Sequence, residues 1–260
     1  MRRHPYLSGP YPRAFAHRGW HVDDLAGMEN SLSALRRAVR EGYRYLETDV
    51  HATADGVVVV HHDDVLDRTT DGVGVIGELP WSVVGRARIG RREPVCRLEQ
   101  LLEELPDALL NIDVKSDQAV EPVLEVLRRC AAWDRVCLAS FSDARLARLR
   151  RLAGPRLLTS MGPNSVAMLW AGGRIGVPLL GGLARGAMAQ VPVRRGQLTV
   201  VGPRFVRVAR RCGVEVHVWT VDERAQMIEL LDLGVDGLVT DRPDLLRAVL
   251  RDRGAWPERV

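Results

Sequence analysis

Residues 45–62 read Y-L-E-T-D-V-H-A-T-A-D-G-V-V-V-V-H-H, two strand-like runs joined by a connection of only five residues. The connection at 52–56 ends in Asp55-Gly56, a strong turn signal. A parallel crossover needs about a dozen residues or more, so this link predicts an antiparallel hairpin. We therefore expect the run at 57–62 to fold back on a strand at 45–51.

On either side of this hairpin, short apolar runs alternate with helical patterns. A first strand is expected at 13–19, and a helix at 31–41 that Asn30 or Ser31 can cap and Gly42 can end. The remaining strands are expected at 109–115, 136–140, 156–161, 187–193, 214–221 and 237–240. The remaining helices are expected at 98–105, 120–130, 144–152, 204–212, 223–233 and 243–251, with a glycine-rich helix or loop running up to Leu183.

This alternation predicts one α/β domain over residues 1–260, folded as a (β/α)₈ TIM barrel. The length of 260 residues suits that fold, which typically takes about 250. The hairpin after the second strand and a small insertion at 63–97 are the expected departures from regularity. An open doubly wound sheet is the rival interpretation of the same pattern.

Polar residues recur at alternate positions along the strand at 45–51. Glu47, Asp49 and His51 therefore share one face. If the hairpin turns at residues 54–55, His62 lies opposite Glu47 on that face and His61 points away. A register slip of one residue would reverse this choice between the two histidines.

The same alternation places Asn111, Asp113 and Lys115 on one face of the next strand. His17 and Arg18 stand where the first strand ends. All these side chains fall toward the carboxyl ends of parallel strands, which is where the active sites of (β/α)₈ barrels lie.

If Glu47, Asp49 and Asp113 gather at one end of the barrel, the three carboxylates repel one another, and one of them is expected to hold a proton unless a cation lies among them. Hard carboxylate oxygens without cysteine favour Mg²⁺ or Ca²⁺. With Arg18 and Lys115 nearby, such a site fits an anionic, oxygen-rich ligand, and phosphate fits best. Any one of these residues could instead be a helix cap or part of a structural ion pair. The prediction of a metal and phosphate site therefore depends on all of them occurring together.

The composition also indicates which partners and which cellular compartment to expect. The chain carries a net charge of +4 spread along its length, and its basic runs contain apolar residues at helical spacing, so we expect no nucleic-acid partner. No apolar stretch reaches the roughly 20 residues of a membrane span, and no secretory pattern follows Met1. The four cysteines form no C-x-x-C pair, which favours free thiols in a reducing, cytoplasmic setting. The oligomeric state is left open.

Eight short motifs appear in an order that resembles one known family. They are H-R-G (17–19), E-N-S (29–31), E-T-D-V (47–50), D-G-V-V-V-V-H-H-D (55–63), N-I-D-V-K (111–115), S-F (140–141), W-T-V-D (219–222) and G-V-D-G-L-V-T-D-R-P-D (234–244). Together they resemble the glycerophosphodiester phosphodiesterases, from about residue 14 to residue 251. The resemblance implies a metal-dependent barrel enzyme that releases sn-glycerol 3-phosphate and an alcohol from a small-molecule glycerophosphodiester.

The resemblance also implies a role for each site residue. His17 and His62 would be the general acid and base, and the divalent metal would bind Glu47, Asp49 and Asp113. The residues implied to contact substrate are Arg18, Lys115, Glu29, Asn30, Phe141 and Trp219. Two positions depart from the family pattern: Asp113 replaces the usual glutamate, and Met28 replaces the usual proline before Glu29.

Several alternatives remain open at this level. A phospholipid-headgroup phosphodiesterase and a non-catalytic phosphodiester-binding barrel share the same fold, and a different metal-dependent barrel hydrolase is a more distant rival. The nucleophile is either the neighbouring glycerol hydroxyl, giving a cyclic phosphate, or water. The leaving alcohol is not indicated; its pocket is expected from the insertion at 63–97 and from loops around 162–186.

Overall fold

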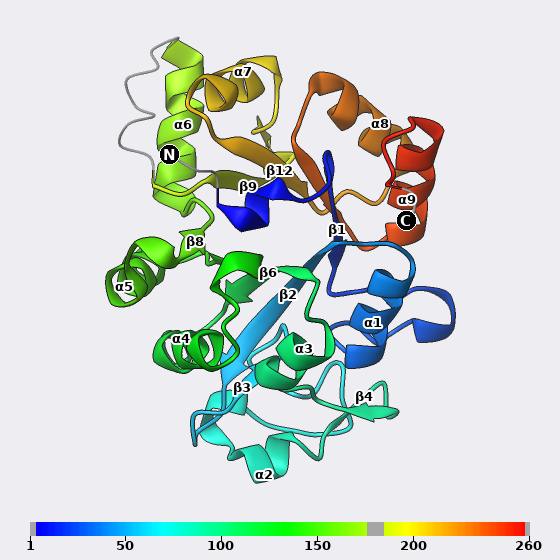
Figure 1. Ribbon diagram of the computed structural model, residues 1–260, viewed down its shortest axis with the longest axis vertical. Helices are drawn as coiled ribbons and strands as arrows, with labels where there is room; N and C mark the ends of the chain where they lie inside the picture. Colours follow the sequence, from blue (N-terminus) through cyan, green and yellow to red (C-terminus); the bar gives the residue numbers. More distant parts are fainter. Residues whose placement is uncertain (1–3, 176–184, 258–260) are drawn as a thin grey trace.

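The computed structural model describes residues 4–175 and 185–257, and it contains a barrel of eight parallel strands (Figure 1). In spatial order the strands are β8 (Leu158–Thr159), β7 (Val136–Ala139), β6 (Leu109–Val114), β2 (Tyr45–Ala52), β1 (Arg13–His17), β13 (Gly237–Thr240), β12 (Glu215–Trp219) and β9 (Met188–Pro192). The predicted (β/α)₈ barrel is confirmed, and the open doubly wound sheet is excluded by the closure described next.

The barrel closes between β8 and β9 through a short seam. A parallel bridge pairs Ser160 with Met188. Two backbone hydrogen bonds accompany it, from Met161 N to Met188 O at 2.8 Å and from Ala187 N to Thr159 O at 3.1 Å. β8 is only two residues long, so this strand is shorter than the one predicted at 156–161.

Helices cover the outside of the barrel and alternate with its strands. Their bounds are α1 (Leu32–Arg40), α3 (Leu98–Glu104), α4 (Val120–Arg129), α5 (Asp143–Ala153), α6 (Pro163–Ile175), α7 (Pro203–Arg211), α8 (Arg224–Leu233) and α9 (Pro243–Asp252). Their apolar faces pack on the strands in one large buried cluster. The cap prediction holds for α1, where Ser31 Oγ accepts a hydrogen bond from Ala34 N at 3.1 Å. Beyond α6, the glycine-rich stretch predicted up to Leu183 lies outside the described residues.

The hairpin after β2 is present, with β3 (Val58–Val60) antiparallel to β2. Its register differs by one residue from the prediction: Val50 pairs with Val60 and Ala52 with Val58. The turn therefore places His61, not His62, opposite Asp49, and His61 N donates to Asp49 O at 3.0 Å. The predicted pairing of His62 with Glu47 is wrong.

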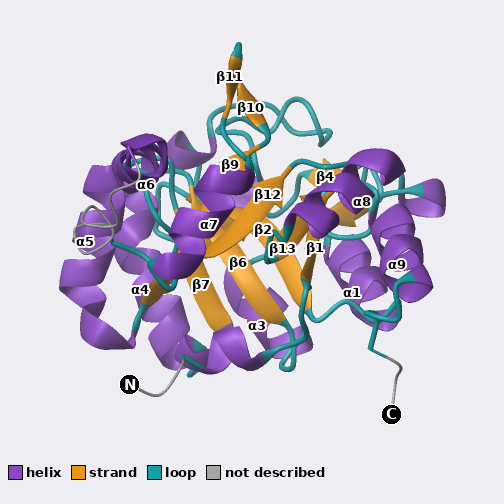
Figure 2. Cartoon of the chain, turned by 90° about the horizontal axis from the view of Figure 1, so that it is seen from above, coloured by secondary structure: helices purple, strands orange, loops and turns teal. Residues whose placement is uncertain are grey.

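The insertion at 63–97 forms a small subdomain at one end of the view in Figure 1. It contains α2 (Trp81–Val84) and a short hairpin of β4 (Arg88–Ile89) with β5 (Glu93–Pro94). An apolar cluster of its own holds it against β3; the fully buried members are Val59, Ile76, Val84 and Ile89. A second hairpin, β10 (Arg194–Arg195) with β11 (Leu198–Thr199), was not predicted, and it projects from the barrel in Figure 2.

A buried ionic network crosses the amino-terminal end of the barrel. Arg13 opens β1 and is 1% exposed. Its guanidinium donates from Nε to Glu215 Oε2 at 2.5 Å and from Nη2 to Oε1 at 2.8 Å, and its Nη1 donates to the Tyr45 hydroxyl. Although burial opposes ionisation, the hydrogen bonds from Arg13 and His217 lower the pKa of Glu215 to about 2. This network ties three strands together at the end opposite the predicted site.

Candidate active site

A cavity of about 790 Å³ lies toward the carboxyl ends of the barrel strands. It brings together most of the residues that the sequence predicted, namely His17, Arg18, Glu47, Asp49, His62, Asp113, Lys115, Phe141 and Trp219. Its other described lining residues include Asn111, Ser140, Met161, Val166, Trp170, Gln190, Arg195, Leu198 and Val200.

His17 is oriented by a carboxylate that the sequence analysis did not select. Its Nδ1 lies 2.6 Å from Asp241 Oδ1, while its Nε2 faces Glu47 Oε2 at 3.6 Å. Burial lowers the pKa of His17, but the neighbouring Glu47 and Asp241 carboxylates outweigh burial and raise it. Asp241 also lies 3.1 Å from His21 Nε2, and together the two imidazoles hold the pKa of Asp241 below its usual range despite burial.

His62 has the same kind of partner. Its Nδ1 lies 2.6 Å from Asp63 Oδ1. Arg68 of the insertion grips the same carboxylate, with Nε 2.6 Å from Asp63 Oδ2, and this contact lowers the pKa of Asp63. The strand ends at Val60, so the chain turns and brings His62 to the cavity, whereas His61 stays buried with Nε2 3.1 Å from Val65 O. The selection of His62 over His61 thus agrees with the cavity lining, although the register that suggested it does not.

Lys115 lies between two carboxylates. Its Nζ is 2.8 Å from Asp49 Oδ1 and 2.8 Å from Asp113 Oδ2. Burial would lower the pKa of Lys115, but Asp49 and Asp113 raise it, so the ammonium is held in its charged form. The Nζ also lies 5.9 Å from the centre of the Phe141 ring, within reach of a cation–π contact.

The buried carboxylates retain oxygens without a hydrogen-bond donor. Glu47 Oε2 and Asp113 Oδ1 are buried and have no hydrogen-bond partner. Burial, followed by the charge of Asp49, raises the pKa of Glu47 to about 8. Burial also raises the pKa of Asp113. Unpaired acidic oxygens of this kind are stabilised by a cation, so the donor set fits a hard divalent ion.

Arg18 reaches the cavity from a strained backbone turn. It has a positive φ of 55°, and Gly19 follows at 93°, where a Cβ would lie 2.8 Å from the α1 backbone at Ala34 and Leu35. The Arg18 guanidinium donates from Nη1 to Glu29 Oε1 at 2.8 Å, while its buried Nε, 3.3 Å from Asp49 Oδ2, has no hydrogen-bond acceptor. Arg18 lines the cavity and therefore brings a positive charge to it.

Glu29 and Asn30 stand behind the cavity and are absent from its lining residues. Glu29 binds both Arg18 and Arg68; burial opposes ionisation, but these guanidinium groups lower the pKa of Glu29 to about 2. Asn30 is 1% exposed, donates from Nδ2 to Asp49 Oδ2 at 3.0 Å and accepts from the Thr48 hydroxyl at 2.6 Å. In this structure Glu29 contacts Arg18 and Asn30 contacts Asp49, so both can hold residues that line the cavity in place, and their predicted contact with substrate stays a prediction.

The insertion at 63–97 contributes no residue to the described lining of the cavity, and its expected part in the alcohol pocket stays a prediction. The loops expected around 162–186 contribute Pro163, Val166, Ala167 and Trp170, all from α6; residues 176–184 of that range lie outside the described residues. Sequence analysis also missed Asp63, Asp241 and Gln190. The two aspartates stand in the H-H-D and T-D-R-P motifs, which was the available signal, whereas Gln190 lies in a run without other polar residues.

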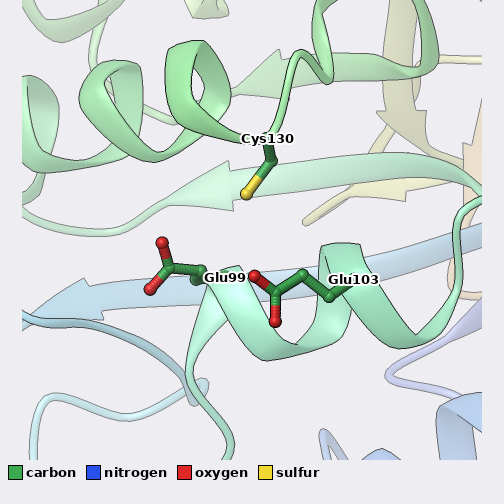
Figure 3. Close-up of side chains that lie close together, drawn as sticks. All are labelled: Glu99, Glu103 and Cys130. Carbon is green, nitrogen blue, oxygen red and sulfur yellow. The ribbon is translucent and has the colours of Figure 1, made fainter.

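Outside the cavity, one group of side chains in the described part of the chain has possible metal-ligand atoms within 4.8 Å of one another. It consists of Glu99 and Glu103 on α3 and Cys130 at the end of α4 (Figure 3). None of the three lines the cavity, and Arg129 Nε donates to Glu99 Oε1 at 3.1 Å. The Glu47, Asp49 and Asp113 oxygens do not meet that spacing among the described residues, and the Lys115 ammonium stands between two of them.

Comparison with known proteins identifies the family. Residues 17–245 match the glycerophosphoryl diester phosphodiesterase family. A Mycobacterium tuberculosis protein named "Probable glycerophosphodiester phosphodiesterase 2" is 42% identical over 94% of this chain and 92% of its own. A glycerophosphodiester phosphodiesterase of Caldanaerobacter subterraneus is 28% identical over 92% of this chain and 98% of its own. The crystal structure of an Agrobacterium tumefaciens glycerophosphodiester phosphodiesterase superposes with a TM-score of 0.76 at 27% identity, covering 92% of this chain and 99% of that one. The chain therefore belongs to the glycerophosphoryl diester phosphodiesterase family, a family of phosphoric diester hydrolases.

Proposed function

We propose that this protein hydrolyses glycerophosphodiesters to sn-glycerol 3-phosphate and an alcohol, with a divalent cation and the His17–His62 pair. The observation that carries the proposal is the shared geometry of these two histidines. Each has a carboxylate 2.6 Å from its Nδ1, so proton exchange with a ligand in the same cavity would take place at Nε2, which in His17 faces Glu47. A protein that only bound phosphodiesters would have no use for two such pairs.

Glu47, Asp49 and Asp113 are the residues that would hold the cation. The unpaired oxygens of Glu47 and Asp113 support this assignment, and their hardness favours Mg²⁺ or Ca²⁺. When bound, such an ion supplies charge withdrawal from the phosphoryl oxygens. Arg18 and Lys115 would share that task, since both line the cavity and bring a positive charge to it.

The histidines would divide the proton transfers. One imidazole takes the proton of the attacking hydroxyl as the new P–O bond forms, and the other protonates the alkoxide as the old P–O bond breaks; each transfer typically contributes about 10²–10⁴-fold. With the neighbouring glycerol hydroxyl as nucleophile, the product of this step is a cyclic phosphate that water then opens. Direct attack by water gives no such species, so trapping the cyclic phosphate distinguishes the two routes.

The experiment that tests the function is choline release from glycerophosphocholine with Mg²⁺ or Ca²⁺ present. We expect turnover by the wild type, and a loss of about 10²-fold or more for both His17→Ala and His62→Ala, with unchanged thermal stability. His4→Ala is the matched control, because His4 lies in the amino-terminal segment and does not line the cavity. Tight binding of glycerophosphocholine without turnover by the metal-loaded wild type would contradict the proposal.

A further inference from the structure

Arg68 of the insertion contacts two carboxylates at once. From one edge of its guanidinium, Nε donates to Asp63 Oδ2 at 2.6 Å and Nη2 donates to Asp63 Oδ1 at 3.1 Å. From the other edge, Nη1 donates to Glu29 Oε2 at 2.9 Å and Nη2 donates to Glu29 Oε1 at 2.7 Å. Both contacts are two-pronged, which is the strong and directional form of a guanidinium–carboxylate pair.

Each of these carboxylates in turn holds a residue of the cavity. Asp63 Oδ1 lies 2.6 Å from His62 Nδ1, and Glu29 Oε1 accepts a hydrogen bond from Arg18 Nη1 at 2.8 Å. Both His62 and Arg18 line the cavity, whereas the three residues that join them do not. A continuous chain of hydrogen bonds therefore links a predicted acid–base histidine to a predicted phosphate ligand, and Arg68 stands at its centre.

The two carboxylates depend on Arg68 for their positions. Without it, the side chain of Asp63 keeps only the contact with His62, and the side chain of Glu29 keeps only the contact with Arg18. Both carboxylates are ionised: although burial opposes it, the guanidinium groups lower the pKa of Glu29 to about 2, and Arg68 lowers the pKa of Asp63. Two negative groups that share one guanidinium repel each other once it is removed.

The fold places Arg68 between its partners. Leu66 O accepts hydrogen bonds from Thr70 N at 3.1 Å and from Thr70 Oγ1 at 2.7 Å, which closes the turn that carries Arg68. Leu66 is 1% exposed and belongs to the same apolar cluster as Met28, the residue before Glu29. Packing of the insertion on this segment therefore sets the distance between Arg68 and the carboxylate of Glu29.

From these contacts we propose that Arg68 is a positioning residue for the phosphodiester reaction. Through Asp63 it fixes the imidazole of His62, which would move a proton. Through Glu29 it fixes the guanidinium of Arg18, which would bind the phosphate. The inference rests on the proposed function, and it gives the insertion a part in catalysis that needs no contact with the substrate.

The geometry calls for a guanidinium and not for a positive charge alone. Arg68 directs two N–H groups at each carboxylate within one plane, whereas the ammonium of lysine is a point charge on a flexible stem. Arg68→Lys conserves the charge and removes both two-pronged contacts. It should therefore behave like Arg68→Ala, and this comparison separates positioning from a general electrostatic effect.

The first test is steady-state release of choline from glycerophosphocholine by the metal-loaded, full-length protein. Because a misplaced catalytic group costs up to about 10²-fold, kcat should fall by about 10–10²-fold in Arg68→Ala and in Arg68→Lys. KM should rise several-fold in the same variants, since Arg18 loses the support of Glu29. Thermal unfolding should stay close to that of the wild type, because exposed ion pairs contribute about 0–1 kcal/mol.

Arg129→Ala is the matched control. The Arg129 side chain is 51% exposed and that of Arg68 is 48% exposed, and Arg129 joins two elements through the carboxylate of Glu99. Arg129 does not line the cavity, and its variant should keep the wild-type kcat and KM.

Chemical rescue provides a second measurement. Arg68 is half exposed, so a free guanidinium ion can enter the space that Arg68→Ala leaves. Guanidinium chloride, at concentrations far below those that unfold proteins, should restore kcat of Arg68→Ala several-fold. Sodium chloride at the same concentration should not, and neither salt should raise kcat of the wild type or of Arg129→Ala.

A third measurement needs no turnover. Because Asp63 lies at Nδ1 of His62, the neutral ring should carry its proton on that nitrogen in the wild type. Nitrogen-15 NMR of the histidine rings reports this tautomer, with His62→Ala identifying the signal. Arg68→Ala should give a mixture of tautomers at His62, whereas Arg129→Ala should keep the wild-type spectrum. Arg68→Lys and the rescue keep the test decisive if Arg68→Ala lowers the unfolding temperature.

The outcomes separate the two proposals. If the wild type does not hydrolyse glycerophosphocholine, the proposed function fails, and the NMR comparison alone decides whether Arg68 positions His62. If the wild type is active and Arg68→Ala matches Arg129→Ala in kcat and KM, the function stands and the role of Arg68 is overturned. That role is equally overturned if Arg68→Lys keeps the wild-type kcat and KM, or if Arg68→Ala leaves the His62 tautomer unchanged.

Discussion

Asp241 Oδ1 lies 2.6 Å from His17 Nδ1, and this contact turns the other ring nitrogen of His17 toward Glu47. Asp63 makes the equivalent contact with His62. The two partners come from very different places: Asp241 directly follows the last barrel strand, whereas Asp63 opens the insertion. In both cases a carboxylate fixes which nitrogen carries the proton.

The first prediction follows from these pairs. Asp241→Asn and Asp63→Asn should each lower kcat by about 10–10³-fold with little change in KM, because the histidine loses its orientation and its charge partner while the substrate contacts remain. The measurement is steady-state hydrolysis of glycerophosphocholine. Asp244→Asn serves as the control, since Asp244 lies on α9 and accepts a hydrogen bond from Arg242, the residue before that helix. Equal activity for Asp241→Asn and Asp244→Asn would refute the positioning role.

Lys115→Arg conserves charge and should still lower turnover about 10²-fold or more. Lys115 Nζ fits between Asp49 and Asp113 at 2.8 Å from each, and a planar guanidinium cannot occupy that position without displacing a carboxylate. Circular dichroism and thermal unfolding should match the wild type. Arg128→Lys is the control: it makes the reverse exchange in an exposed ion pair of α4, and it should retain full activity. Near-normal rates for Lys115→Arg would contradict the argument.

Divalent metal should stabilise the wild type, and Glu47→Gln should abolish that effect. A ligand at about 100 times its Kd adds about 2.7 kcal/mol to the free energy of unfolding, which raises Tm by several degrees for a chain of this size. Differential scanning calorimetry with and without Mg²⁺ or Ca²⁺ measures this without any activity assay. Glu103→Gln tests the group of Glu99, Glu103 and Cys130, and this variant should keep the rise in Tm on adding metal. A shift lost in Glu103→Gln and kept in Glu47→Gln would place the metal outside the cavity.

Stability should fall at acid pH through Glu215. Arg13 and His217 lower the pKa of this carboxylate to about 2 from a value near 4.5, so its ionised form stabilises the fold above about pH 4.5, and that contribution is lost as pH falls toward 2. The shift corresponds to about 3 kcal/mol. Denaturant unfolding at pH 7, 5, 4 and 3 should therefore show a steeper loss for the wild type than for Glu215→Gln, which starts lower because Arg13 is left buried without its anion.

The control for this series is Glu125→Gln, which removes one member of an exposed ion pair on α4. It should follow the wild-type pH dependence closely, because exposed pairs contribute about 0–1 kcal/mol. Parallel curves for the wild type and Glu215→Gln between pH 5 and 3 would rule out Glu215 as the source of acid sensitivity.

The barrel could be predicted from local sequence patterns, because apolar residues recur at helical or strand spacing in nearly every element. Ser31 caps α1 as its sequence context predicts, and Asp113 and Lys115 reach the cavity together as strand alternation predicts. The hairpin at 194–199 was missed, since its two-residue strands are too short to leave a periodic signal.

Register and side-chain pairing were beyond the reach of sequence alone. The β2–β3 hairpin is shifted by one residue, so strand alternation would have selected His61; His62 reaches the cavity because the strand stops at Val60. Glu29 accepts a hydrogen bond from Arg68, which lies 39 positions further along the chain. Pairings over such separations are fixed by how the insertion packs on the barrel, and no local spacing encodes that packing.

Lys115 is the only lysine of this chain. Apart from the terminal amine, every reagent that acylates amines has a single target here, and that target lies inside the cavity. Because two aspartates keep the ammonium protonated, labelling should be slow and should accelerate only at strongly alkaline pH. Mass spectrometry of the intact, labelled protein would thus read out occupancy of the cavity as a single mass increment.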